Sequence, residues 1–100
     1  MSKLYITEHR RLTRSDDGHI MQIPGEYGVD QAPVDFSGGA AQSAAFAATT
    51  KYISICPDAT CSIAFGVSPT ATANNRRIPQ NFFGYFPVFG GDKLSVVGNT

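Results

Sequence analysis

The second half of the chain, residues 51–100, alternates short runs of β-branched and aromatic residues with clusters of Gly, Pro and Asp. Such runs, separated by turn residues, are typical of half-buried antiparallel strands. The pattern predicts two successive β-hairpins, the first from residues 51–56 and 61–66 and the second from residues 81–89 and 93–98. It therefore predicts an all-β fold, a small antiparallel β-sandwich or barrel built from hairpins.

The first 40 residues carry weaker strand signals. We expect residues 1–40 to form an extended N-terminal arm with short strands and a turn at residues 15–18 (SDDG), and residues 41–100 to form the core. One hundred residues suit a single domain of this kind. Residues 42–50 (QSAAFAATT) are interpreted as a further strand that carries Phe46 inward.

The chain is poor in charge. Charged residues make up 16% of it, where about a quarter is usual, and the formal net charge is zero. Phosphate binding depends on a basic excess, so nucleic acid is not an expected partner. A surface with few charges is easier to bury against another protein. Residues 1–14 are mainly basic, and residues 15–35 contain five acids and no Lys or Arg, so the two stretches could pair within one chain or between neighbouring copies.

The cellular compartment bears on the two cysteines, Cys56 and Cys61. No apolar run approaches the roughly 18–20 residues of a membrane span, and the N-terminus lacks the apolar region of a signal peptide. We therefore expect a chain made in the cytoplasm, with no membrane partner. In a symmetric first hairpin the cysteines would lie opposite each other, close enough for a disulfide. We favour two buried, reduced thiols, because a short loop stabilises little and the cytoplasm is reducing.

The densest aromatic run lies within residues 81–89. Strand alternation sends one set of large residues to each face: Phe82, Phe86 and Val88 to the first, and Phe83, Tyr85 and Phe89 to the second. A strand buried on both faces would explain the run, and so would an exposed interface. Both interpretations stay open. The candidate interface comprises the second set of aromatic residues and two arginine pairs, Arg76 with Arg77 on a polar excursion and Arg10 with Arg11 in the arm.

No catalytic or metal-binding pattern accompanies the strands. Both histidines, His9 and His19, lie in the polar N-terminal third, away from the cysteines, so neither a nucleophile–His arrangement nor a zinc site is expected. No glycine-rich phosphate-binding motif occurs, and Gly90-Gly91-Asp92 is interpreted as a hairpin loop. We expect a non-enzymatic protein without a cofactor.

Several stretches resemble a group of small proteins of tailed bacteriophages and prophages. They are AQSAAF at 41–46, TKYISI at 50–55, DATCSIAFG at 58–66, SPTATA at 68–73, KLSVVGNT at 93–100 and the opening KLYITE. The group shares the pattern D-x-x-C-x-I-x-x-G-x-x-P-x-A-T, which consists of structural residues. The resemblance implies a virion structural role, and it assigns no functional residue.

From this resemblance and the predicted fold we expect a virion protein, preferably a capsid decoration or auxiliary head protein on the outer capsid lattice. Its expected partners are the major capsid protein and copies of itself, as a homo-oligomer in the particle. A tail or head–tail connector component is the structural alternative. A carbohydrate- or receptor-binding module is the alternative from another class, with Phe83, Tyr85 and Phe89 as its stacking platform.

Overall fold

The regular structure of the described residues consists entirely of β-strands. The computed structural model describes residues 2–10, 12–14, 20–24 and 28–99. Within these ranges no helix is long and apolar enough to cross a membrane. The strands are β1 (Lys3–His9), β2 (Leu12–Arg14), β3 (Ile20–Pro24), β4 (Val29–Asp30), β5 (Val34–Asp35), β6 (Ala41–Gln42), β7 (Tyr52–Pro57), β8 (Cys61–Gly66), β9 (Arg76–Ile78), β10 (Gly84–Pro87) and β11 (Lys93–Gly98).

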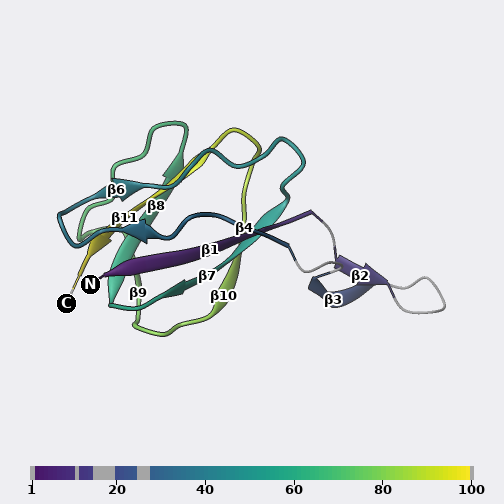
Figure 1. The fold of residues 1–100 in the computed structure, drawn as a ribbon, viewed down its shortest axis with the longest axis horizontal. Coiled ribbons are helices and arrows are strands. Elements are labelled where there is room, and N and C mark those ends of the chain that lie inside the picture. Colours follow the sequence, from purple (N-terminus) through teal and green to yellow (C-terminus); the bar gives the residue numbers. More distant parts are fainter. Residues whose placement is uncertain (1, 11, 15–19, 25–27, 100) are drawn as a thin grey trace.

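Two antiparallel sheets pack face to face (Figure 1). The β1 sheet has the strand order β10-β7-β1-β4, with β5 also paired to β1. The β11 sheet has the order β6-β11-β8-β9. Strands β2 and β3 pair with each other and form a separate two-stranded sheet. The described chain is therefore a small β-sandwich, which confirms the predicted fold class.

The core lies between the two sheets. Alternate residues of each strand point inward, as the pleat of a strand requires. The β1 sheet contributes Leu4, Ile6, Val34, Ile53 and Ile55, and the β11 sheet contributes Cys61, Ile63, Ile78, Leu94 and Val96. Phe36, Phe46 and Val88 close the core from connecting segments. The inward face of β7 is therefore the isoleucine face.

Neither predicted hairpin forms. Strand β7 pairs with β1 and β10, whereas β8 pairs with β11 and β9, so the two strands of the first predicted hairpin belong to different sheets. The same holds for β10 and β11. Their connecting turns cross from one sheet to the other. At the first crossing the Lys3 amide donates to Oδ1 of Asp58 at 2.6 Å, and the Asp58 amide donates to the Lys3 carbonyl at 3.0 Å.

Strand β1, which lies within the predicted arm, belongs to the sandwich. This strand lies between β7 and β4 in the middle of its sheet, and Leu4 and Ile6 are among the most deeply buried residues. Strands β4 and β5 join the same sheet, so most of the described N-terminal part belongs to the sandwich. Only the β2–β3 sheet projects from it (Figure 1). The predicted turn at residues 15–18 lies outside the described residues.

The interpretation of residues 42–50 as a strand is wrong beyond Gln42, where β6 ends. Phe46 nevertheless points inward and is buried as expected. Its backbone is held by the second crossing, since the Phe46 amide donates to the Asp92 carbonyl at 2.8 Å and the Gly91 amide donates to the Phe46 carbonyl at 2.8 Å.

The polar segment of residues 67–75 covers the outer face of the β11 sheet. The Ala71 amide donates to Oγ of Ser95 at 2.9 Å, and Asn99 donates from Nδ2 to Oγ of Ser62 at 2.8 Å and to the Ala73 carbonyl at 3.2 Å. Both serines are buried. Small side chains allow this close approach, so part of the small-residue composition serves packing within the chain.

If β1 is a structural part of the sandwich, its inward residues must contribute to the free energy of unfolding. Leu4→Ala should lower the free energy of unfolding by about 2–5 kcal/mol, because it removes a fully buried side chain and leaves a cavity. The matched control is Tyr5→Ala, at a neighbouring side chain that is 48% exposed, and it should cost much less. Thermal and urea unfolding measure both. Equal, small effects would mean that β1 is a removable arm.

Candidate functional site

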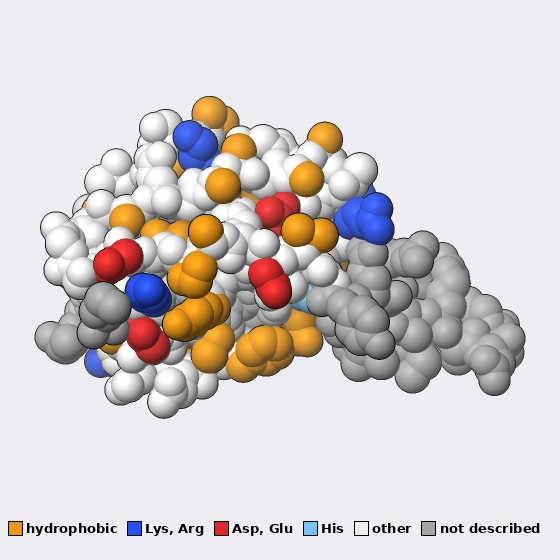
Figure 2. Space-filling model, viewed as in Figure 1, with side chains coloured by type: hydrophobic (Ala, Val, Ile, Leu, Met, Phe, Trp, Pro, Cys, Tyr) orange, Lys and Arg blue, Asp and Glu red, His pale blue; other side chains and the backbone are white. Residues whose placement is uncertain are grey.

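Aromatic side chains gather on the outer face of the β1 sheet. We call this surface the aromatic face. It consists of Tyr5 and His9 from β1, Tyr52 from β7, Tyr85 from β10, and Phe83 from the residue just before β10. Tyr5, Phe83 and Tyr85 are 48%, 62% and 49% exposed. Figure 2 shows hydrophobic side chains gathered over β1, β7 and β10, beside the pale-blue histidine. In a small domain, clustered exposed rings are the kind of surface that a partner covers.

The strand register builds the ring cluster. His9 lies opposite Tyr52, and Tyr85 lies opposite Ser54 on the other side of β7. The His9 and Tyr52 rings stack with centroids 4.8 Å apart, and Tyr85 meets Tyr52 edge-on at 5.9 Å. Phe83 meets Tyr85 in the same way at 5.4 Å. These are favourable aromatic geometries, so the rings support one another and present a preorganised surface.

His9 anchors the cluster from below. Its side chain is buried, and its Nε2 shares a hydrogen bond of 3.0 Å with Oγ of Ser54. The backbone at Gly28 lies directly over it. A Cβ at Gly28 would stand 2.6 Å from Cγ2 of Thr7 and 2.9 Å from Cε1 of His9, and the φ angle of +88° also favours glycine. The imidazole is thus fixed by its neighbours and serves as a support for the tyrosine rings.

The side chains between the rings are neutral. Thr7, Ser54 and Cys56 occupy the same outer face, and the nearest carboxylate at the rim is Asp30, which accepts a 2.7 Å hydrogen bond from Oγ1 of Thr7. A neutral aromatic surface suits burial against protein, and it offers no cationic stripe for a phosphate backbone.

Glu8 is the carboxylate closest in sequence to this face, and its contacts are structural. Its Oε1 accepts hydrogen bonds from Oγ1 of Thr50 at 2.6 Å and from the Ala47 amide at 2.9 Å, and its Oε2 accepts one from Nε2 of Gln31 at 2.9 Å. Burial alone would raise the pKa of this carboxyl, but these hydrogen bonds together hold the pKa below its ordinary value of 4.5. The ionised carboxylate therefore ties the segment of residues 44–50 to β1.

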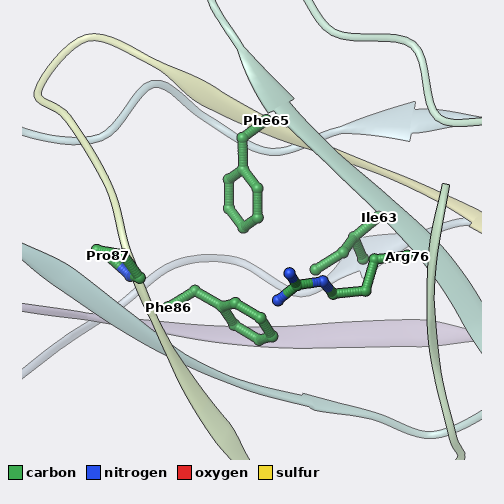
Figure 3. A pocket seen from close by; sticks show the side chains of 5 residues that line it. All are labelled: Ile63, Phe65, Arg76, Phe86 and Pro87. Carbon is green, nitrogen blue, oxygen red and sulfur yellow. The ribbon is translucent and has the colours of Figure 1, made fainter.

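A second feature is a hollow at one edge of the sandwich, between β8 and β9 of one sheet and β10 of the other. Its volume is about 350 Å³, and it is lined by Ile63, Phe65, Arg76, Phe86 and Pro87. Figure 3 shows the Arg76 guanidinium reaching into the space beside Phe86, with the Phe65 ring on the opposite side. The Arg76 guanidinium carbon lies 5.4 Å from the centre of the Phe86 ring, a cation–π contact.

The structure separates the predicted interface residues into several places. Phe83 and Tyr85 lie in the aromatic face, whereas Phe89 is 79% exposed and takes no part in the described ring contacts. Of the predicted first face, Phe86 and Val88 point inward, whereas Phe82 is 38% exposed and its ring folds over Gly84.

The predicted arginines also lie apart from one another. Arg76 and Arg77 are exposed on β9, at the edge of the other sheet. Arg10 follows β1 and is exposed, and Arg11 lies outside the described residues.

Three residues of the aromatic face escaped the sequence analysis: Tyr5, His9 and Tyr52. The alternation of Leu4 and Ile6 with Tyr5 and Thr7 carried the signal, and extending it by one step would have placed His9 on the same face. Tyr52 required the pairing of β7 with β1, which no local pattern indicates.

The cysteines differ in environment, and both are free thiols. Cys56 is half-buried on the outer face of β7, opposite Tyr5, and Cys61 is buried in the core of the other sheet. Burial raises the pKa of Cys61 to about 11. In the described part of the chain no three His, Cys, Asp or Glu side chains come together as a possible metal site.

No protein-family model, curated protein or solved structure matches the chain. The function is therefore argued from the geometry of the aromatic face and of the edge hollow.

Glu8 makes stability depend on pH with a defined sign. Since the folded-state pKa is depressed, the contribution of Glu8 is present above about pH 4.5 and is lost as the pH falls through the folded-state value. Glu8→Gln should destabilise the protein at neutral pH, and the difference from wild type should shrink in acid. Urea unfolding at a series of pH values between about 3 and 7 measures this difference. A difference independent of pH would contradict the role of the ionised carboxylate.

The two thiols should react at very different rates. A maleimide at mildly alkaline pH should label Cys56 first, because Cys61 is buried and its raised pKa leaves little thiolate. Mass spectrometry should find one label on the folded protein and two after denaturation. Cys56→Ser is the matched control and should remove the fast label. Labelling of Cys61 at the rate of Cys56 would contradict its place in the core.

Proposed function

We propose that the chain is a non-enzymatic structural protein of a tailed-phage particle, an auxiliary head protein that binds the outer capsid lattice through its aromatic face. The observation that carries the proposal is the contrast between the two outer faces of the sandwich. The chain covers the outer face of the β11 sheet with its own residues 67–75. It leaves the rings of Tyr5, Phe83 and Tyr85 on the β1 sheet exposed.

The chemistry of the aromatic face favours a protein partner. Tyr and Phe rings supply large contact area at a small cost in side-chain entropy, and such residues dominate the centres of protein interfaces. Tyr5 and Tyr85 can bury their rings while their hydroxyl groups keep hydrogen bonds at the rim. The stacked His9 and Tyr52 hold the surface in place before binding, which lowers the ordering cost on association.

The choice of a phage particle rests on the sequence resemblance, which covers most of residues 41–100 and the first eight residues. The residues that carry it, such as Asp58, Cys61 and Ile63, hold turns and core in the sandwich. They support a shared fold with those phage proteins. The aromatic face then supplies a contact surface of the kind that an attached particle protein needs.

Binding to isolated particle parts tests this proposal. Heads lacking the protein, and tails, are prepared from the phage that encodes the chain and are each mixed with the purified protein, and the bound fraction is measured by co-sedimentation. We expect saturable binding to heads. Binding to tails alone would favour the connector alternative, and binding to neither part but to surface glycans of the host would favour a receptor-binding module.

A point variant tests whether the aromatic face makes the contact. Tyr85→Ala should weaken head binding by about 2 kcal/mol, roughly 30-fold, since Tyr85 touches three of the other rings in the cluster. Its melting temperature should fall by only a few degrees, because half of the ring is exposed. The matched control is Phe89→Ala, at a more exposed ring outside the cluster, which should bind like wild type. Undiminished binding by Tyr85→Ala would place the contact elsewhere.

A further inference from the structure

We propose that copies of this chain associate head to tail, with Val29 and Asp30 of one copy entering the edge hollow beside Arg76 of the next. The contact uses the two edges of the sandwich and leaves the aromatic face free. It is thus independent of the head-binding proposal.

The lining of the hollow suits an apolar side chain that is followed by an acidic one. We call the hollow the socket. Its walls are Ile63, Phe65, Phe86 and Pro87, and its one charged group is the Arg76 guanidinium (Figure 3). Stacking on Phe86 occupies one plane of the guanidinium and leaves its N–H edge available for a carboxylate. In the described part of the chain no carboxylate forms an ion pair with Arg76. Phe65 is 39% exposed, so the hollow is open, and a small molecule there would keep much of its surface in water.

The opposite edge of the β1 sheet carries the residues that would fill the socket, Val29 and Asp30, which we call the plug. Strand β4 is Val29–Asp30, and the Val29 side chain is 66% exposed, which is unusual for a branched apolar residue in a strand. Asp30 is exposed and uses Oδ1 to accept a hydrogen bond from Thr7, which leaves Oδ2 for a partner. Asp35 on β5 adds a second exposed carboxylate at this edge, opposite in sign to Arg76 and Arg77 on β9. Complementary charges fix the orientation of such contacts.

The sheet order makes the contact intermolecular. Strands β4 and β10 are the two edges of the β1 sheet, three strand positions apart, which is about 14 Å at about 4.8 Å per spacing. One copy therefore cannot fill its own hollow with its own β4. Because plug and socket are different surfaces, every added copy presents a new free end, and the assembly grows into a ring or an open array. Pro87 on β10 lacks an amide hydrogen, so insertion of side chains is favoured over pairing of strand edges.

Two complementary charge reversals test the contact. Asp30→Arg disables the plug and keeps the socket, and Arg76→Glu disables the socket and keeps the plug. Analytical ultracentrifugation of the full chain should show wild type forming species larger than a dimer as its concentration rises. Each variant alone should associate roughly tenfold more weakly or worse. An equimolar mixture of the two variants should associate more strongly than either variant alone, because the intact plug of one variant meets the intact socket of the other and the two reversed side chains are again opposite in charge.

Further variants keep the test decisive. Lys51→Glu changes an exposed cation just before β7 that lies neither on β4 nor among the residues lining the hollow, and it should associate like wild type. Should Asp30→Arg disturb β4, as circular dichroism would reveal, Val29→Lys replaces it, because that side chain already faces solvent. The proposal is overturned if wild type stays monomeric up to millimolar concentration. It is also overturned if the mixture associates no better than either variant, or if Lys51→Glu weakens association as much as Arg76→Glu.

Discussion

The pairing of β1 with β7 is the interaction on which the rest of the structure depends. Six successive residues of each strand are in register, from Leu4 opposite Pro57 to His9 opposite Tyr52. The inward residues of this pair form one wall of the core. Its outward residues bring the His9 imidazole under the Tyr52 ring, and β10 then adds Tyr85. One ladder thus sets both the stability of the sandwich and the shape of the aromatic face.

The connections between consecutive strands explain why this ladder matters. The turns after β7 and after β10 both cross to the other sheet, so β7 does not pair with β8, and β10 does not pair with β11. Apart from the pairing of β8 with β9, the ladders of the two main sheets join strands that are not consecutive in the chain, and folding must close long loops before these contacts form. The same strand connectivity places β4 at one edge of the β1 sheet and β9 beside β10 at the other side of the sandwich. Unlike edges are what a directional contact between copies requires.

The faces and edges of the sandwich divide the possible contacts between them. One outer face is closed by the chain itself, where Ser95 accepts a hydrogen bond from the Ala71 amide and Asn99 links Ser62 to the Ala73 carbonyl. The other outer face is aromatic and neutral and suits attachment to a larger surface. The edges are charged and of opposite sign and suit contacts between copies. In the two proposals, the aromatic face serves the contact with the lattice and the edges serve the contact between copies.

The sequence by itself determined the all-β class, the positions of most strands and the placement of Phe83 and Tyr85 on one face of their strand, because these follow from strand alternation and turn residues close in the chain. Only the tertiary structure decided which strands pair. A turn such as residues 57–60 has the same composition whether it closes a hairpin or crosses between sheets, and the free energy of burying Ile53 and Ile55 against Ile63 and Leu94 settles the choice. For the same reason β1 reads locally as part of an arm, yet its partners make it a central strand. His9 and Tyr52 join the aromatic face, and Arg76 meets Phe86, through pairings between distant segments, which no local pattern contains.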